Sequence, residues 1–424
     1  MANVFDTLNQ RGFVSHCSEQ QLAEKLEKPM TLYAGFDPTA ESLHIGNLLQ
    51  IMILAQFQRH GHTPIVLVGG ATAMIGDPSG KNEERNLLNE ETIQQNLEGI
   101  KQQLRHFLDF EGVANRAIMV NNADWIGKFS FVEFLRDVGK HFRVGEMMGK
   151  ESVRKRLQSE VGMSFTEFSY QLLQAYDFLY LSREYNCQLQ VGGDDQWGNV
   201  VAGIDLTRKL DGRAVYGLTS PLITDSNGQK FGKTATGEKC WLAAEKTSPY
   251  EFYQYWIRSD DRDAIKLLKY FTFLPLEQIA ELEKTVQEQP EKREAQKVLA
   301  EEVTRLAHGE EQLVLVQTAS RFLFGEEISG LGDHELVSIF ANVPSTLLPL
   351  ERLNQGLPIL DALCETGLCG SRGEAKKLVK AGGAYVNNIR VNAIDHTLTP
   401  DSRASESILV LRSGKKNYHL LRFD

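Results

Sequence analysis

The first half of the chain alternates short apolar runs with longer stretches in which apolar residues recur at helical spacing. The short runs are typical of strands and cover residues 31–36, 64–68, 117–120 and 188–191. Helical patterns cover residues 44–60, 164–185 and the stretch that ends near 210. This alternation predicts an α/β fold with a Rossmann-like, doubly wound parallel sheet. Ligands of such a sheet bind beyond the carboxyl ends of its strands.

The pattern changes after Thr234. Apolar residues recur at helical spacing from 249 to about 323, and glycines and prolines then punctuate residues 325–349. The last block combines a helical stretch, 372–380, with short β-like runs at 384–386 and 408–411. The sequence therefore predicts a Rossmann-like catalytic domain over 1–240, an α-helical domain over 241–328, a linker over 329–350 and a small α+β domain over 351–424.

The composition is that of an ordinary globular protein, with 424 residues, 42% hydrophobic and 24% charged. Apolar runs fall short of the roughly 20 residues that a membrane helix needs, and the N-terminal segment lacks the basic-then-apolar shape of a signal peptide. We therefore expect a cytoplasmic protein without a membrane partner. Five scattered cysteines lack the spacing of a metal site, so we expect neither a structural metal nor a disulfide framework.

Charge is unevenly distributed along the chain. The net charge of −10 argues against a protein coated in basic groups. From Arg352 onward, however, 11 lysines and arginines face 7 aspartates and glutamates, a net charge of +4. This tail is the basic part of the chain. Composition alone favours RNA binding and an ordinary solvated surface about equally.

The run from Gly35 to Asn47 begins at the end of a predicted strand and enters a predicted helix. The unpaired amides and the dipole of a helix N-terminus favour a bound anion. Thr39 and His44 are candidate donors to phosphate oxygens, and Gly46 leaves room for a nucleoside against the backbone. A helix cap with an incidental histidine is the alternative, and His-Ile-Gly-Asn by itself does not decide between the two.

A second run, Lys230-Phe231-Gly232-Lys233-Thr234, follows a turn-rich segment. Lys230 and Lys233 are three residues apart and can converge on one polyphosphate, and Thr234 adds a hydroxyl. A solvated basic loop is the commoner explanation of an isolated Lys-x-x-Lys. Lys81 and Arg85, after the second predicted strand, form a third basic candidate.

Three polar residues form one stripe of the long helix predicted over 164–185. Tyr170, Gln174 and Asp177 lie at positions i, i+4 and i+7, so their side chains face the same way and can meet one ligand. Without other motifs, a core tyrosine with two solvated neighbours would be the more common explanation.

Together these motifs resemble the class I aminoacyl-tRNA synthetases and, within them, the bacterial tyrosyl-tRNA synthetases. The similarity spans essentially the whole chain and includes the runs Tyr33–Asp37, Gly69–Thr72, Phe165–Tyr170, Gln174–Asp177 and Asp195–Asn199. The chain departs from the family pattern in three places. Asn47 stands where a second histidine is common, Ala34 replaces a cysteine of some relatives, and Asp194 replaces a frequent serine.

The resemblance implies a tyrosine–tRNA ligase that first joins L-tyrosine to ATP as tyrosyl-adenylate, with release of pyrophosphate, and then charges the 3'-terminal adenosine of tRNA(Tyr). Mg²⁺ is expected with the ATP substrate, and no tightly bound cofactor or resident metal is expected. The family also implies a homodimer. The implied catalytic residues are Thr39, His44, Lys230, Lys233 and Thr234. The implied tyrosine-binding residues are Tyr170, Gln174 and Asp77 at the ammonium group and Tyr33 and Asp177 at the phenol. The implied ATP-binding residues are Gly35, Asp37, Gly46, Asn47, Gly193, Asp195 and Lys233.

RNA contacts are implied for three regions. The C-terminal block resembles a small RNA-binding fold, in which Arg372, Lys376 and Lys380 form a basic stripe and Lys415 and Lys416 a second cluster. Candidate acceptor-stem contacts are Arg208, Lys209, Lys150, Arg154, Lys155 and Arg156. The helical domain is expected to meet the anticodon arm.

Two alternatives remain at this point. One is a related enzyme, either a tryptophanyl-tRNA synthetase or a nucleotidylyltransferase with the same histidine and lysine motifs. The other is a non-catalytic RNA-binding protein built on a synthetase fold. Tyr33 with Asp177 favours tyrosine, and the intact His44, Lys230 and Lys233 weigh against a protein without catalysis.

Overall fold

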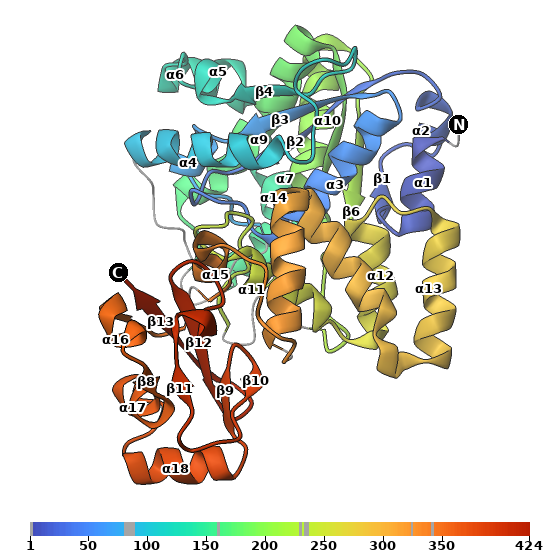
Figure 1. The fold of residues 1–424 in the computed structure, drawn as a ribbon. Coiled ribbons are helices and arrows are strands. Elements are labelled where there is room, and N and C mark those ends of the chain that lie inside the picture. Colours follow the sequence, from blue (N-terminus) through green and yellow to red (C-terminus); the bar gives the residue numbers. More distant parts are fainter. Residues whose placement is uncertain are drawn as a thin grey trace. The chain divides into compact units, whose positions relative to one another are not determined.

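Residues 3–79, 90–158, 162–228, 231–232, 237–323, 325–340 and 343–424 are described by the computed structural model (Figure 1). The chain divides into two units, Met1–Gly309 and Glu310–Asp424, and each is treated by itself below. Within the described residues, no helix combines the length and the apolar character needed to cross a membrane.

A six-stranded sheet organises the first unit. Its strands are β1 (His16–Cys17), β2 (Thr31–Phe36), β3 (Thr63–Val68), β4 (Ile118–Asn121), β5 (Cys187–Gly193) and β6 (Tyr216–Ser220). The order is β1-β6-β5-β2-β3-β4; five strands run parallel, and the short β1 pairs antiparallel with β6. The predicted doubly wound parallel sheet is confirmed. The strand order switches between β2 and β5, so the carboxyl ends of these two strands mark the expected ligand site.

Long helices between the strands have clear start and stop signals. They are α3 (Ile45–Arg59), α9 (Phe165–Tyr185) and α10 (Trp197–Asp211). Ser164 caps α9 by accepting a hydrogen bond from the Glu167 amide, and the helix ends at Asn186, whose φ is 50°. The remaining helices of the α/β part are α1 (Val4–Arg11), α2 (Leu22–Lys25), α4 (Glu90–Leu104), α5 (Ala123–Ile126), α6 (Phe131–Asp137), α7 (Val144–Met148) and α8 (Glu151–Leu157).

The helical stretch predicted after residue 249 is present. It comprises α11 (Pro249–Ile257), α12 (Asp261–Phe271), α13 (Leu276–Glu288) and α14 (Glu294–Leu323). Gly309 within α14 has a φ of 85° and a ψ of 168°, so two helices meet there, at the border of the two units. The division expected at residue 240 falls inside the first unit. One reason is Arg11 of α1, whose buried guanidinium donates to the carbonyls of Lys269, Thr272 and Leu274 beyond it in the chain.

The second unit is a small α+β fold. Its main sheet has the order β10-β9-β12-β13-β7. The strands of the unit are β7 (Ser345–Leu348), β8 (Leu357–Pro358), β9 (Ala384–Val386), β10 (Ile389–Arg390), β11 (Thr397–Leu398), β12 (Ile408–Ser413) and β13 (Asn417–Phe423). Besides the part of α14 that follows Gly309, its helices are α15 (Asp333–Ile339), α16 (Leu350–Asn354), α17 (Ile359–Glu365) and α18 (Arg372–Lys380).

Residues 329–350, expected to form a linker, contain α15 and β7 instead. Strand β7 pairs in parallel with β13, so this stretch completes the sheet of the second unit. The glycines and prolines that suggested a linker flank these elements. Gly330, with a φ of 78°, precedes α15, whereas Pro344 and Pro349 bracket β7. Breaker residues at element borders look the same in sequence as breaker residues within a linker.

Candidate active site

A pocket of about 660 Å³ lies at the carboxyl ends of β2 and β5, where the strand order switches. The first sequence motif and the helical stripe contribute to its wall. The predicted residues that line it are Tyr33, Gly35, Asp37, Thr39, His44, Gly46, Asn47, Asp77, Tyr170, Gln174, Asp177, Gly193 and Asp195. Every residue predicted to bind an amino acid or a nucleotide and described by the structure thus lines one pocket.

Tyr33 and Asp177 form its most deeply buried polar pair, since each side chain is 1% exposed. The Tyr33 hydroxyl has no hydrogen-bond partner within the described part of the chain. Burial, followed by the negative charge of Asp177, raises the pKa of Tyr33 well above its usual value. Burial also raises the pKa of Asp177 to about 7. A buried hydroxyl without a partner beside a buried carboxyl suits a ligand that both donates and accepts a hydrogen bond.

Two residues that the sequence analysis missed hold Asp177. The Asn122 amide donates to one carboxylate oxygen at 3.0 Å, and the Trp125 indole donates to the other at 2.8 Å. These bonds lower the pKa of Asp177 but do not outweigh its burial. Asn122 directly follows β4, at the edge of the sheet where ligands bind. This position could have identified Asn122 as a site residue from the sequence, whereas nothing in the sequence pointed to Trp125.

Two hydroxyl donors contact the carboxylate of Asp37. The Tyr170 hydroxyl donates to one of its carboxylate oxygens at 3.2 Å, and the Thr72 hydroxyl donates to the other at 3.0 Å. A β-carbon at Gly69 would lie 2.2 Å from an Asp37 oxygen, so glycine at that position makes room for this carboxylate. Asp37, which was predicted to bind ATP, thus lies beside Tyr170, which was predicted to bind the amino acid.

A chain of amides connects Asp77 to Gln174. Gln196 donates to the Asp77 carboxylate at 2.6 Å, and Gln174 donates to the Gln196 carbonyl at 3.2 Å. Asn199 then donates to the Gln174 carbonyl at 2.9 Å. Gln196 and Asn199 belong to the run Asp195–Asn199, but the sequence analysis assigned neither of them a function. The Asp37 and Asp77 carboxylates, with these carbonyls, make this part of the pocket suited to a cation.

His44 is the N-cap of α3. Its Nδ1 accepts a hydrogen bond from the Gly46 amide at 3.0 Å, while the Asn47 side-chain oxygen accepts from the His44 amide at 3.1 Å. The neutral imidazole therefore carries its proton on Nε2, where it is a donor. A β-carbon at Gly46 would lie 2.7 Å from the imidazole, which explains the glycine. The histidine is thus a helix cap, and capping leaves its ring in the donor form that an anion requires.

The described residues of the second motif lie against the first motif. A β-carbon at Gly232 would be 3.3 Å from the backbone nitrogen of Gly46. Cys240 joins the two motifs, because its amide donates to the Gly232 carbonyl and its carbonyl accepts from the Ile45 amide, both at 3.0 Å. Lys230, Lys233 and Thr234, as well as Lys81 and Arg85, lie outside the described residues.

The turn between β5 and α10 presents Gly193 and Asp195. A β-carbon at Gly193 would lie 2.8 Å from the Asp195 carboxylate, so glycine keeps this space open. The neighbouring Asp194, whose role the sequence left open, accepts hydrogen bonds from the Ser15 and Thr219 hydroxyls, each at 2.7 Å. His16 Nδ1 lies 3.0 Å from the same Asp194 oxygen that Thr219 contacts. The extra carboxylate fastens this turn to β1 and β6.

The basic candidates for RNA contact differ in accessibility. Arg208 and Lys209 are exposed at the end of α10, where Arg208 pairs with Asp205 at 2.8 Å. Arg156 is buried and pairs with the equally buried Glu167 at 2.7 Å, so its assignment to an RNA-facing cluster is corrected. Lys150 donates to the Gly198 carbonyl at 2.5 Å, and burial lowers its pKa to about 8.

In the second unit, α18 exposes the predicted basic stripe. Arg372, Lys376 and Lys380 are exposed, and Ala375 and Val379 on the same helix are buried in the core. Arg372 also pairs with Asp361 at 2.9 Å. Lys415 and Lys416 are exposed in the turn between β12 and β13.

The same described ranges offer no cluster of side chains suited to a metal ion. They contain no group of three or more histidine, cysteine, aspartate or glutamate side chains that could hold a metal ion.

Two family models match the chain. Residues 24–325 match "tRNA synthetases class I (W and Y)", and residues 335–421 match "Tyrosine--tRNA ligase SYY-like C-terminal domain". A tyrosine–tRNA ligase of Rhodopirellula baltica is 51% identical over 423 residues, which cover 99% of this chain and 96% of that protein. Another, from Geobacillus kaustophilus, is 50% identical over 421 residues, 98% of each chain.

Solved structures agree with the sequence relatives. The C-terminally truncated mitochondrial tyrosyl-tRNA synthetase of Aspergillus nidulans superposes with a TM-score of 0.69 and 31% identity, over 76% of this chain and 95% of that one. The equivalent enzyme of Coccidioides posadasii gives a TM-score of 0.65 and 35% identity, over 75% of this chain and 92% of that one. The chain therefore belongs to the tyrosine–tRNA ligase family of the class I tRNA synthetases.

Proposed function

We propose that the pocket between β2 and β5 makes tyrosyl-adenylate from L-tyrosine and ATP, and that the tyrosyl group then passes to the 3'-terminal adenosine of tRNA(Tyr). One observation carries the assignment of the substrate. The unpartnered hydroxyl of Tyr33 and the carboxyl group of Asp177 are buried side by side in the pocket that His44 also lines.

In this proposal the substrate phenol lies between Tyr33 and Asp177. Its ammonium group is held by Tyr170, Gln174 and Asp77, with Asp37 as a further carboxylate beside Tyr170. Phenylalanine would leave the phenol-binding groups buried and unsatisfied, at a cost of about 1–3 kcal/mol for each group. The polar groups at the phenol end thus select against an amino acid that lacks the hydroxyl.

In the first step, the tyrosine carboxylate attacks the α-phosphorus of ATP. A new oxygen–phosphorus bond forms, and the bond to the departing pyrophosphate breaks. Because the carboxylate is already ionised, no protein nucleophile is needed, and catalysis rests on positioning and on stabilisation of negative charge. Thr39 and His44 donate to phosphate oxygens, Lys230, Lys233 and Thr234 hold the pyrophosphate, and Mg²⁺ enters with ATP as part of the substrate.

The nucleotide occupies the side of the pocket formed by Gly35, Gly46, Asn47, Gly193 and Asp195. The Asn47 side-chain oxygen accepts the amide of His44, so its NH₂ group is the one that faces a ligand in this proposal. Asp195 accepts from the ribose hydroxyls in the space that Gly193 leaves open.

In the second step, a ribose hydroxyl of the terminal adenosine attacks the adenylate carbonyl, and AMP leaves. The basic stripe of α18 with Lys415 and Lys416 is proposed to bind tRNA phosphates. Arg208 and Lys209 are proposed as acceptor-stem contacts, and helices α11–α14 as the part that meets the anticodon arm. The C-terminal family match supports an RNA-binding role for the second unit.

We further propose that the enzyme is a cytoplasmic homodimer. Large apolar side chains remain exposed along α6 to the start of α9, namely Phe131, Val132, Val144, Met148, Leu157 and Phe165. A second copy of the chain would cover such residues. Phe165→Asp should then shift the sedimentation coefficient from that of a dimer to that of a monomer, whereas an unchanged value would argue against this interface.

The amino-acid dependence of ATP–pyrophosphate exchange tests the proposed function. Tyrosine should support exchange, whereas tryptophan or the absence of an amino acid should not. Lys233→Ala should slow adenylate formation by about 10²–10³, because a transition-state donor is lost. Exchange that proceeds equally with tryptophan would assign the pocket to a different amino acid, and exchange with none of them would favour a non-catalytic RNA-binding protein.

A further inference from the structure

We propose that Asp263 of α12 and Tyr255 of α11 are positioning residues for the lysine segment, which we define as residues 230–234. They bind described residues that lie before Lys230 and between Lys230 and Lys233, and do so from the helical part of the chain. The inference rests on the proposed function, in which Lys230 and Lys233 act on the departing pyrophosphate.

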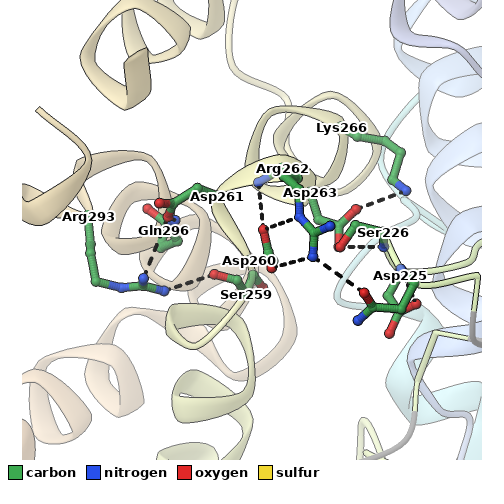
Figure 2. Close-up of polar contacts among 11 residues, drawn as sticks. Asp225, Ser226, Ser259, Asp260, Asp261, Arg262, Asp263, Lys266, Arg293 and Gln296 are labelled. Carbon is green, nitrogen blue, oxygen red and sulfur yellow. Dashed lines mark hydrogen bonds and ion pairs between the residues drawn. The ribbon is translucent and has the colours of Figure 1, made fainter. Parts of the chain in front are cut away.

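The stretch before the lysine segment is fastened to α12. Asp263 is 5% exposed, and one of its carboxylate oxygens accepts a hydrogen bond from the Ser226 amide at 2.9 Å. Lys266 lies 3.3 Å from the other oxygen and also donates to the Thr224 carbonyl at 2.8 Å. Figure 2 shows Asp263 between Ser226 and Lys266. A buried carboxylate therefore binds backbone that leads directly to the lysines.

The turn that follows is closed by its own hydrogen bonds. The Asp225 side chain accepts from the Asn227 amide at 2.9 Å, and its carbonyl accepts from the Gly228 amide at the same distance. Gly228 has a φ of 77°, which suits glycine at the end of such a turn. Because the turn is held together internally, the bond from Ser226 to Asp263 places Asp225–Gly228 on α12 as a unit.

Phe231 and Gly232 are fastened to α11. The Gly232 amide donates to the Tyr255 hydroxyl at 3.0 Å. The Phe231 ring packs on Tyr255, with 5.4 Å between ring centroids, and on Trp256 and Phe271 at 5.8 and 6.3 Å. The Phe231 amide also donates to the Ile223 carbonyl at 3.0 Å, which joins the backbone between the lysines to the stretch that precedes them. The backbone before Lys230 and the backbone between the two lysines are thus bound by helices that follow them in the chain.

These contacts matter for catalysis because a misplacement of about 1 Å in a group that stabilises the transition state can cost on the order of 10²-fold in rate. Asp260 offers a contrast on the same helix. It caps α12 by accepting from the Arg262 amide at 2.9 Å and pairs with the Arg262 side chain at 2.9 Å. Asp260 reaches the turn only indirectly, through Arg262, whose guanidinium donates to the Asn227 side-chain oxygen at 3.4 Å, whereas Asp263 binds the Ser226 backbone amide directly (Figure 2).

Single-turnover adenylate formation by the full-length enzyme tests the inference. Asp263→Ala should lower the rate by about tenfold or more while the dissociation constant for tyrosine stays within about twofold. Asp263→Asn keeps a side-chain carbonyl for the Ser226 amide and should recover most of the rate. Asp260→Ala, the matched control, should lower the melting temperature and leave the rate within about twofold. Tyr255→Phe should slow the reaction, whereas Tyr253→Phe on the same helix should not.

A double-mutant cycle with Lys233→Ala separates this inference from the proposed function. If Asp263 acts through the lysines, Asp263→Ala should add little once Lys233 is gone. A normal rate for Lys233→Ala alone would overturn the proposed role of the lysines. A slow Lys233→Ala enzyme with a normal Asp263→Ala enzyme, or with effects that simply multiply, would overturn the positioning role of Asp263. A rate loss in Asp260→Ala equal to that in Asp263→Ala would overturn it as well.

Discussion

Gly232 of the second motif lies against Gly46 of the first, so close that a β-carbon at Gly232 would be 3.3 Å from the Gly46 nitrogen. Gly46 in turn supplies the amide that fixes the His44 ring. The backbone that leads into Lys233 is therefore in contact with the helix N-terminus proposed to receive the phosphates. This contact joins two motifs that lie far apart in the sequence, and each is ambiguous by itself.

Gly232→Ala should weaken catalysis more than a matched change at Gly237. Both glycines have positive φ, 108° and 85°, but only Gly232 has an atom of the first motif within 4 Å, since a β-carbon at Gly237 would meet nothing. Backbone strain costs about 1–3 kcal/mol at each site, so the difference between the variants reports the motif contact. We expect pyrophosphate exchange to fall about tenfold further in Gly232→Ala. Equal losses in both variants would show that only strain matters.

Tyrosine affinity should rise with pH around neutrality. Burial raises the pKa of Asp177 to about 7, so the carboxyl is mostly protonated at about pH 6 and mostly ionised at about pH 8. A phenol donates best to the ionised form, and binding therefore releases a proton below the pKa. The dissociation constant measured by equilibrium dialysis should fall by about tenfold from pH 6 to pH 8, as the ionised fraction rises. In Asp177→Asn this dependence should disappear; its persistence would place the titrating group elsewhere.

Trp125→Phe should move that pH profile upward. The indole donates to Asp177 at 2.8 Å, and this bond lowers the pKa of the carboxyl. Phenylalanine keeps an aromatic ring against Tyr180, which stacks on Trp125 with 4.3 Å between centroids, but cannot donate. The midpoint of tyrosine binding should therefore shift to higher pH, and affinity at neutral pH should fall. An unshifted midpoint would mean that the indole does not control the ionisation of Asp177.

Truncation after Gly309 should separate the two reactions. The border of the second unit lies at this residue, where the φ and ψ of Gly309 interrupt α14. The shortened chain should retain tyrosine-dependent pyrophosphate exchange within about threefold, since the pocket lies wholly in the first unit. Charging of tRNA(Tyr) should fall by at least tenfold, because the proposed phosphate contacts of α18 are removed. Loss of exchange in a folded truncated protein would contradict this division of labour.

Sequence patterns within single elements predicted much of the fold. The elements that were not predicted are mostly those whose polar residues are buried by contacts with distant parts of the chain. The bounds of β2 and α18 were predicted correctly from the spacing of their apolar residues. Strand β6 was not predicted because it ends in Thr219 and Ser220, two fully buried polar residues. The Asp194 carboxylate and the Gln50 amide satisfy their hydroxyls, and neither partner is near them in sequence.

The site shows the same limit. The stripe from Tyr170 to Asp177 could be found because one helix carries it. Trp125 could not be assigned because it reaches Asp177 from a separate element after β4, and for Asn122 the only signal was its position directly after that strand. Arg156 resembled a surface cation in sequence, since nothing local revealed its burial against Glu167. Contacts between residues that are distant in the sequence therefore cannot be predicted from periodicity and spacing.

We expect the pocket of Tyr33 and Asp177 to make an adenylate of tyrosine. The most direct test is mass spectrometry of the nucleotide retained by the full-length enzyme after incubation with ATP, Mg²⁺ and equal amounts of tyrosine, phenylalanine and tryptophan, with no tRNA. We expect tyrosyl-adenylate to be retained in clear excess over the other two adenylates, and its loss in Asp177→Ala. A predominance of tryptophanyl-adenylate, or no adenylate from a folded enzyme, would contradict the account.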